Sequence, residues 1–243
     1  MIAELQQLWQ EAFGDSQEDI AEFFATGFSP QRVHCIWEDG KPVSALHWFD
    51  SRLADKKIAY LYAVATARAH RGKGLARRLM DETRTILTEK GYAGMILVPM
   101  QESLFGFYKK LGFTPATTIN EFICDAGPYP APLTRIDAEQ YARLRKTYLS
   151  ANSVLQEKEV FAYLQTYAQF YMGTDFLLTA TAEGDLLTVH EFLGNTQAAP
   201  NILNTLGLPR GKFRAPGNGR AFSVFFPLQS NCPAPDYFGL AMD

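Results

Sequence analysis

The 243-residue sequence has few of the features that mark specialised classes of protein. Its three cysteines, Cys35, Cys124 and Cys232, lie far apart without a CxxC pair, so we expect reduced thiols in a cytoplasmic protein. No window approaches the ~18 apolar residues that a membrane-spanning helix needs. The first residues, Met1-Ile2-Ala3-Glu4-Leu5, lack the basic and apolar regions of a signal peptide. We therefore expect no membrane association.

The sequence also lacks an excess of either charge. Its formal net charge is -3, so it has no basic surface of the kind that binds nucleic acid. No His, Cys, Asp or Glu cluster has metal-ligand spacing, so we expect no metal. Hydrophobic residues make up 47% and charged residues 20%, as in ordinary globular proteins. A chain of this length forms one large domain or two modest ones.

The first half alternates between helical and extended hydrophobic periods. Gly14 ends an N-terminal helix, Ser16 and Asp19 form the capping box of a second helix, and Asp39-Gly40 indicates a hairpin. The predicted elements, in order, are a helix over 2–13, a helix after Ser16, strands over 33–37, 43–48 and 58–64, a helix from Leu75 to Gly91, a strand over 95–98, a helix capped by Ser103, and a strand over 119–123.

A proline-rich segment over 127–132 predicts a boundary between two halves, so we expect domains at 1–127 and 128–243. The second half is predicted to contain helices over 138–148, 158–171 and 200–206, and strands over 176–182, 186–192 and 221–226. This order of helices, hairpin, helix and strand repeats that of the first half. We therefore predict that the second half is a degenerate copy of the first.

A glycine-rich loop joins the third predicted strand to the long helix. Gly72 and Gly74 allow the backbone N–H groups to converge, and the first N–H groups of a helix beginning at Leu75 lack internal partners. The positive end of the helix dipole favours an anion, and Arg71 and Lys73 add positive charge. The sequence therefore predicts a phosphate or pyrophosphate site here.

Two common nucleotide motifs do not fit this loop. A Walker loop needs Ser or Thr after its lysine and a glycine five residues before it, but Lys73 is followed by Gly74 and preceded by Arg68 at that distance. A dinucleotide fingerprint needs a third glycine where Arg77 stands. A nucleoside-triphosphate enzyme is therefore disfavoured.

The residues Arg71, Gly74 and Ala76 match the pattern Arg/Gln-x-x-Gly-x-Gly/Ala, which resembles the signature of the GNAT superfamily of acetyl-CoA-dependent N-acetyltransferases. The surrounding elements follow the order of that family, and Phe-Tyr-Lys-Lys-Leu-Gly-Phe over 107–113 is similar to its "fYeklGF" element. The resemblance implies an α+β or α/β fold, with a mixed central sheet and helices on both faces. The whole chain resembles the first two regions of the mycobacterial enhanced-intracellular-survival acetyltransferase family, in which an active GNAT region precedes a degenerate one.

In the GNAT superfamily, acetyl-CoA lies in a wedge between two parallel strands, which here would end at Val64 and Val98. The resemblance therefore implies one acetyl-CoA per chain as co-substrate, and no metal. It assigns coenzyme binding to Val64, Ala65, Thr66, Arg71, Gly72, Lys73, Gly74, Leu75, Ala76 and Ser103.

Tyr108 matches the tyrosine that protonates the departing thiolate in this superfamily, although it also lies on an apolar stripe typical of a core aromatic. In the tandem family a C-terminal carboxylate reaches the active site. We therefore predict that the apolar tail over 236–243 docks and brings Asp243 near Tyr108. The general base stays open among Glu102, Glu121, His47, His190 and other residues of the second half.

The resemblance implies an N-acetyltransferase that acts by direct transfer on a primary amine of a small molecule or peptide. The alternative is a catalytically silent acyl-CoA-binding regulatory module. Tyr60, Tyr62 and Phe49 either line an acceptor pocket or pack in the core. The sequence leaves the acceptor and the oligomeric state open, including a homo-oligomer.

Overall fold

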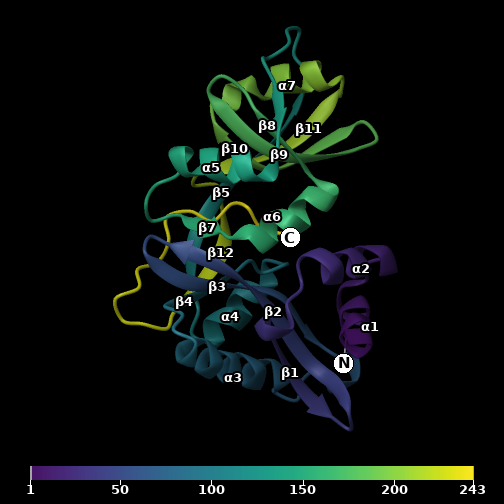
Figure 1. Cartoon of the computed structure of the whole chain (residues 1–243), viewed down its shortest axis with the longest axis vertical. Helices are drawn as coiled ribbons and strands as arrows, with labels where there is room; N and C mark the ends of the chain where they lie inside the picture. Colours follow the sequence, from purple (N-terminus) through teal and green to yellow (C-terminus); the bar gives the residue numbers. More distant parts are fainter. Residues whose placement is uncertain (1, 243) are drawn as a thin grey trace. The chain divides into compact units, whose positions relative to one another are not determined.

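The computed structural model describes residues 2–242, in which helices and strands alternate along the chain (Figure 1). The helices are α1 (Ile2–Phe13), α2 (Gln17–Thr26), α3 (Leu75–Glu89), α4 (Ser103–Lys110), α5 (Ala138–Tyr148), α6 (Lys158–Tyr167) and α7 (Ala199–Leu206), with 3-10 turns η1 (Pro30–Arg32), η2 (Arg68–His70) and η3 (Thr196–Ala198). Among these described helices, none has the length and apolar character needed to span a membrane.

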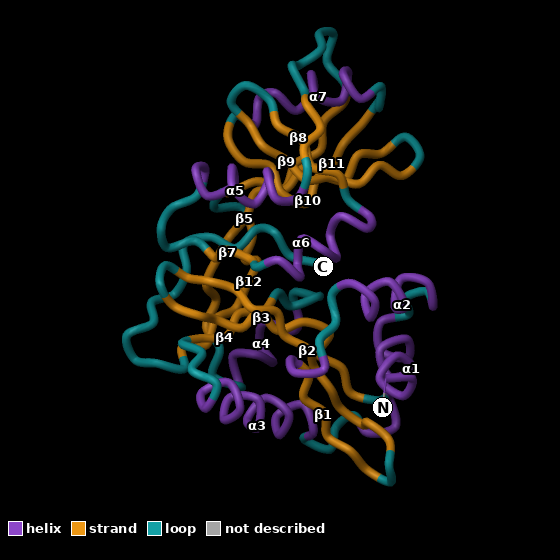
Figure 2. Tube along the Cα trace, viewed as in Figure 1, coloured by secondary structure: helices purple, strands orange, loops and turns teal. Residues whose placement is uncertain are grey.

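The strands, drawn in orange in Figure 2, belong to mixed sheets in which most pairs are antiparallel. They are β1 (Val33–Glu38), β2 (Lys41–Leu53), β3 (Lys56–Thr66), β4 (Gly94–Leu97), β5 (Thr114–Asp125), β6 (Thr134–Ile136), β7 (Val154–Gln156), β8 (Gln169–Met172), β9 (Phe176–Glu183), β10 (Leu186–Gly194), β11 (Arg210–Pro216) and β12 (Arg220–Pro227).

The chain divides into two compact units that interleave along the sequence. The first contains the residues up to Thr114 with Gln156–Tyr163 and Val224–Ala234, and the second contains Pro115–Leu155, Leu164–Ser223 and the residues from Pro235 onward. These units differ from the predicted domains 1–127 and 128–243. The difference arises because β5 lies before the proline-rich segment, yet it pairs antiparallel with β11, a strand of the second unit.

The first unit contains a mixed sheet in the order β1, β2, β3, β4 and the Val224–Pro227 part of β12. β1, β2 and β3 are antiparallel neighbours, and Asp39 and Gly40 form the turn between β1 and β2 with φ of 50° and 75°. β4 runs parallel to β3, with Ile58 opposite Gly94. The predicted hairpin and the predicted parallel strand are both confirmed.

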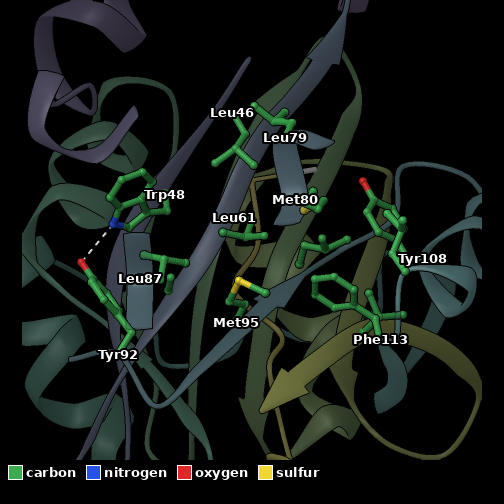
Figure 3. Packing of buried hydrophobic residues seen from close by; sticks show 14 of the residues in the cluster. Leu46, Trp48, Leu61, Leu79, Met80, Leu87, Tyr92, Met95, Tyr108 and Phe113 are labelled. Carbon is green, nitrogen blue, oxygen red and sulfur yellow. Dashed lines mark hydrogen bonds between the residues drawn. The ribbon is translucent and has the colours of Figure 1, made fainter. Parts of the chain in front are cut away.

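One face of this sheet packs against α3 and α4. Leu46, Trp48 and Leu61 of the sheet share a buried cluster with Leu79 and Met80 of α3 (Figure 3). The Trp48 indole Nε1–H donates to the Tyr92 hydroxyl at 2.9 Å. Helix α3 is therefore fixed on the sheet by burial of its apolar side chains.

The opposite face carries an aromatic cluster beneath α1 and α2. The Phe23 ring of α2 lies 5.5 Å from the ring of His47 and 6.2 Å from that of Phe49, measured between centroids. His47 is fully buried, and its Nε2 accepts the N–H of Ser29 at 3.1 Å. Burial, and then the charge of Arg32, lowers the pKa of His47 to about 3, so this histidine is neutral. Helices thus cover both faces of the sheet, as predicted.

The second unit contains the strands β5, β11, β10, β9, β8 and β6 in that order. β9 and β10 form an antiparallel pair, α7 follows, and β11 returns parallel to β10 with Leu186 opposite Arg210. The first unit has the same succession in β2, β3, α3 and β4. This shared topology is what a tandem of two related halves requires.

The helix predicted over 158–171 is shorter in the structure. α6 ends at Tyr167, and Gln169–Met172 instead forms β8, which pairs with both β6 and β9. Phe170 is buried whereas Gln169 and Met172 are exposed, and the pairing that makes this short segment a strand is with residues far from it in the sequence. This part of the sequence prediction was wrong.

A buried ion pair joins α5 to β10 in the second unit. Arg145 Nε and Nη2 donate to the two carboxylate oxygens of Glu191 at 2.6 and 2.9 Å, and both side chains are at most 1% exposed. The hydroxyls of Tyr141 and Tyr237 donate to the same carboxylate at 2.8 and 3.1 Å. Burial raises the pKa of both phenols, which therefore stay protonated as donors.

The C-terminal segment is packed within the second unit, as the sequence predicted. The Tyr237 carbonyl accepts the N–H of Val154 at 2.8 Å, and Phe238, Leu240 and Ala241 are at most 2% exposed. The tail is therefore docked as far as the described residues extend. Asp243, the predicted catalytic carboxylate, lies outside them.

We predict that Arg145→Ala lowers the free energy of unfolding by about 3–5 kcal/mol, because it leaves the Glu191 carboxylate buried without its counterion. Urea unfolding followed by circular dichroism measures this change. The matched control is Arg210→Ala, whose guanidinium is 61% exposed at 3.7 Å from Asp125 and should matter little. Equal effects of the two substitutions would contradict the prediction.

A second prediction concerns pH. Unfolded histidine has a pKa of about 6.5 and folded His47 has one of about 3, so only the unfolded chain binds this proton between those values. The stabilising contribution of neutral His47 is complete above about pH 6.5 and falls on acidification by up to about 1.4 kcal/mol per pH unit. Urea unfolding of wild type and His47→Gln between about pH 7 and 5 should show a shallower loss for the variant. Parallel curves would exclude the buried neutral state.

Candidate functional site

The strands β3 and β4 separate part-way along the sheet of the first unit. Their parallel pairing runs from Ile58 opposite Gly94 to Tyr60 opposite Ile96, whereas β3 continues to Thr66. Within residues 2–242, this edge of β3 beyond Tyr60 pairs with no other strand. The sequence predicted such a divergence between the strands that end at Val64 and Val98, and it starts a few residues before them.

A β-bulge occupies β3 where the strands diverge. Ala45 pairs with Ala65 and His47 with Tyr62, so Ala63 and Val64 together face the single residue Leu46. Ala63 has a φ of 52°, which is unusual for a residue with a side chain. Bulges of this kind redirect a strand and are frequent beside active sites. Here the bulge leaves residues 62–64 half-exposed between buried neighbours, so their backbone can reach a ligand.

The glycine loop after β3 presents a set of free backbone amides. Gly72 and Gly74 both have a φ of 78°, and Gly74 is the N-cap of α3. The first hydrogen bond of that helix is from Arg78 N–H to the Gly74 carbonyl at 3.1 Å. In the described chain, the N–H groups of residues 72–77 have no hydrogen-bond acceptor. Such converging donors at the positive end of a helix form an anion site.

The ends of the loop are tied to the surrounding structure. Arg71 Nε donates to the Thr66 carbonyl at 3.1 Å, and Thr66 Oγ1 lies 2.9 Å from Ser44 Oγ. The side chain of Leu75 is buried in the core, so only its N–H faces the anion site. Lys73 is exposed and its side chain makes no hydrogen bond within the described residues. The geometry thus gives Arg71 a structural contact and leaves the Lys73 ammonium free.

Tyr108 lies in the core cluster beside these elements. Its ring packs against Phe107 and Phe113, with centroids 5.2 and 5.7 Å apart, and the side chain is 6% exposed. Its hydroxyl points away from Phe113 (Figure 3). Burial raises the pKa of Tyr108 to about 12. The hydroxyl is therefore protonated at neutral pH and available as a donor.

Ser103 does not cap α4, contrary to the sequence prediction. Helix α4 begins at Ser103, its N-cap is Glu102, and no side chain accepts a capping hydrogen bond. The reason is that Glu102 is already helical, and backbone bonds from Leu104 to Gln101 and from Phe105 to Glu102 close the first turn. A role for Ser103 at the coenzyme stays a prediction.

The four candidate general bases differ in pKa, exposure and position. The hydrogen bond from Arg220, supported by the charges of Lys212 and Arg214, lowers the pKa of Glu121, which makes it a weak base. His47 is inaccessible and has a low pKa, as described above. His190 belongs to the second unit, where its Nε2 lies 2.8 Å from Thr181 Oγ1. Glu102 is exposed at the start of α4.

The three aromatic residues that were considered for an acceptor pocket differ in how deeply they are buried. Phe49 and Tyr60 are at most 2% exposed, and their rings stack with centroids 5.9 Å apart. Tyr62, two residues further along β3, is half-exposed next to the bulge. Phe49 and Tyr60 are therefore core residues, whereas Tyr62 is only partly buried and packs against Phe23 with ring centroids 5.2 Å apart.

The corresponding turn of the second unit lacks a comparable set of amides. Asn195 N–H donates to the Asp175 carbonyl at 3.0 Å, and Gln197 N–H donates to Asn195 Oδ1 at 3.1 Å. Pro200, in the first turn of α7, has no N–H at all. The Asp175 carboxylate also accepts from Asn195 Nδ2 at 3.0 Å and would repel an anion. This turn is therefore unsuited to pyrophosphate.

Metal-ligating groups do not cluster in the part of the chain that the structure describes. No set of three His, Cys, Asp or Glu side chains there could hold an ion. Cys35, Cys124 and Cys232 are all free thiols. The site is thus composed of backbone amides, basic side chains and a buried phenol.

Comparison with known proteins places this arrangement in a family. The family model described as an acetyltransferase (GNAT) domain matches residues 2–116. Among curated proteins, none matches this sequence. Proteins of this family use acetyl-CoA as co-substrate and act in general on amine acceptors.

Solved structures share the fold over nearly the whole chain. A GCN5-related N-acetyltransferase from Kribbella flavida aligns with a TM-score of 0.71 and 15% identity, covering 95% of this chain and 70% of that one. A second, from Anabaena variabilis, has a TM-score of 0.73 and 14% identity, covering 94% and 70%. Eis1 from Mycobacterium abscessus has a TM-score of 0.65 and 10% identity, covering 91% and 70%.

The matched segment contains the diverging strands, the amide-lined loop, α3 and Tyr108 in a single continuous region. The structural similarity extends beyond it into the second unit, where the identity is too low to show more than a shared fold. Residues 2–116 thus match the acetyltransferase (GNAT) domain, and the chain shares the fold of solved N-acetyltransferases over nearly its whole length.

Proposed function

We propose that this protein is an N-acetyltransferase that moves the acetyl group of acetyl-CoA directly to a primary amine of a small molecule or peptide. The observation that carries the proposal is the set of free amides at residues 72–77, next to the diverging edge of β3. An anion site beside an open strand edge suits a ligand with a pyrophosphate and an extended amide-containing arm.

The proposal assigns each part of the coenzyme to a part of the site. The amides of Gly72, Lys73, Gly74, Leu75 and Ala76 bind the pyrophosphate, while Arg71 keeps the loop joined to β3. The open edge over 64–66 binds the pantetheine arm as an additional strand would. Ser103, in the first turn of α4, is the proposed contact on the other side of the ligand.

The reaction requires a neutral amine, a polarised thioester and a proton for the leaving sulfur. The amine nitrogen forms a bond to the thioester carbon, the C–S bond breaks, and the thiolate takes a proton from the Tyr108 hydroxyl. Because burial raises the pKa of Tyr108 to about 12, the phenol keeps its proton until the thiolate forms. The phenolate then recovers a proton as the products leave.

The proposed base is Asp243, which would accept the proton of the amine. Its support is that the tail up to Ala241 is held by buried apolar contacts and by the hydrogen bond from Tyr237 to Glu191.

A silent acyl-CoA-binding module is the second candidate function. It would need the same loop but no proton donor. The protonated phenol of Tyr108, whose ring packs in the cluster that also includes Val64 and Leu75, favours catalysis over silence. The next prediction separates the two.

We predict that Tyr108→Phe lowers kcat by about 10²- to 10⁴-fold, as expected for loss of a general acid, with little change in the KM for acetyl-CoA. Thiol release from acetyl-CoA with a panel of primary amines measures the rate. Phenylalanine retains the ring contacts with Phe107 and Phe113, so the fold should be preserved. Tyr129→Phe, at a residue 71% exposed, is the control. Unchanged turnover in Tyr108→Phe would remove the tyrosine from the mechanism.

We also predict that Gly74→Ala raises the KM for acetyl-CoA by about 5- to 30-fold, because a φ of 78° costs a residue with a side chain about 1–2 kcal/mol. Lys73→Ala should have a smaller effect, since its contact is through the backbone. Gly207→Ala introduces similar strain at a φ of 68° at the end of α7, in the second unit, and should leave this KM unchanged. An effect of Lys73→Ala larger than that of Gly74→Ala would contradict the assignment.

A further inference from the structure

The last turn of α1 contacts the start of the glycine loop. The Arg68 backbone N–H donates to Glu11 Oε1 at 2.6 Å, and Arg68 Nη2 donates to the Glu11 carbonyl at 3.2 Å. These residues are 57 positions apart in the sequence. Arg68 opens the 3-10 turn η2, which leads directly into Arg71 and the two glycines. A pair of hydrogen bonds to one residue fixes both the position and the orientation of this turn.

Helix α1 is a firm support for such a contact. Its buried stripe consists of Leu5, Leu8 and Trp9, which are 0%, 4% and 3% exposed. The Trp9 ring also packs against Phe23 of α2, with centroids 5.6 Å apart. The helix therefore cannot shift without disturbing the aromatic cluster, and Glu11 transmits its position to the loop.

The loop has few other supports. Arg71 holds the strand end through the Thr66 carbonyl at 3.1 Å, and His70 Nε2 lies 3.3 Å from Glu38. Space around the Cβ positions of Gly72 and Gly74 is open, so side-chain packing does not restrict either residue. Ordering a mobile loop when a ligand binds costs free energy and lowers the affinity, unless other contacts already hold the loop in its bound conformation.

The negative charge of Glu11 would not itself favour coenzyme binding. A carboxylate close to a pyrophosphate site repels the ligand, so its electrostatic effect alone disfavours binding. Hydrogen bonding and charge therefore predict opposite results when the side chain is removed. Glutamine separates them, because its amide oxygen accepts the same N–H without the charge.

We propose that Glu11 is a positioning residue that links α1 to the pyrophosphate-binding loop and holds its amides ready for the coenzyme. This inference rests on the proposed function, because it assumes that the loop binds the coenzyme A pyrophosphate. It adds to the coenzyme site a residue outside the loop, on a helix that packs on β2 and β3. Glu11 does not contact the reacting atoms.

The test is calorimetric titration of CoA into wild type, Glu11→Ala, Glu11→Gln and Glu18→Ala. Glu11→Ala should raise the Kd for CoA by about three- to tenfold, the range expected for one lost hydrogen bond. Glu11→Gln should restore affinity close to that of wild type. Glu18→Ala removes an exposed carboxylate from the neighbouring helix and serves as the charge control. The inhibition constant of pantetheine, which has no pyrophosphate, should be the same in all four proteins.

Three results would overturn the inference. They are an unchanged or lower Kd in Glu11→Ala, an equal increase in the alanine and glutamine variants, and an equal increase in the inhibition constant of pantetheine. Thermal melting checks that each variant is folded. If Glu11→Ala has a much lower melting temperature than wild type, the Kd of Glu11→Gln for CoA is the measurement that remains. Wild type that fails to bind CoA would reject the proposed function itself. Wild type that binds CoA with the same affinity as Glu11→Ala rejects only the role of Glu11.

Discussion

The site depends on a group of backbone N–H donors that the fold leaves without partners. A helix start has such donors by necessity, and most proteins satisfy them with a capping side chain. Here the N-cap is Gly74, which has no side chain to offer and has a φ of 78°. The core must then hold α3 in place, which the burial of Leu75, Leu79 and Met80 achieves.

The second unit shows that topology alone does not create the site. Its strands β9, β10 and β11 with α7 repeat the order and direction of β2, β3, β4 and α3. However, the backbone amides of its turn donate hydrogen bonds to Asn195 and Asp175, and Pro200 has no N–H to donate. Its bulged strand carries Glu191, which is buried against Arg145 instead of facing an opening. The same framework thus leaves a set of free backbone amides in one unit and holds a structural ion pair in the other.

The sequence predicted the elements that have a strong local signal. The loop, α3 and β3 follow from glycines and hydrophobic period, and α5 was predicted with its observed ends. β8 and β11 were missed or misassigned because Gln169–Met172 is short and Arg210–Pro216 is charged, so pairing partners decide their structure. The bulge at Ala63 depends on register with β2. The contact between Glu11 and Arg68 joins residues too distant in sequence for any local pattern to reveal.

The two interpretations of Tyr108, core aromatic and proton donor, depend on the same burial. Packing against Phe107 and Phe113 removes the phenol from water, and this desolvation raises its pKa to about 12. Such a group holds its proton against the solvent and against weak bases. A thiol has an ordinary pKa of about 8.5, so proton transfer from this phenol to a thiolate in water would be unfavourable. The proposed acid role therefore requires that the leaving thiolate is itself made more basic by desolvation in the same apolar surroundings, where an uncompensated negative charge is costly. The apolar stripe that marks Tyr108 as a core residue is therefore also the condition on which its proposed role as an acid depends.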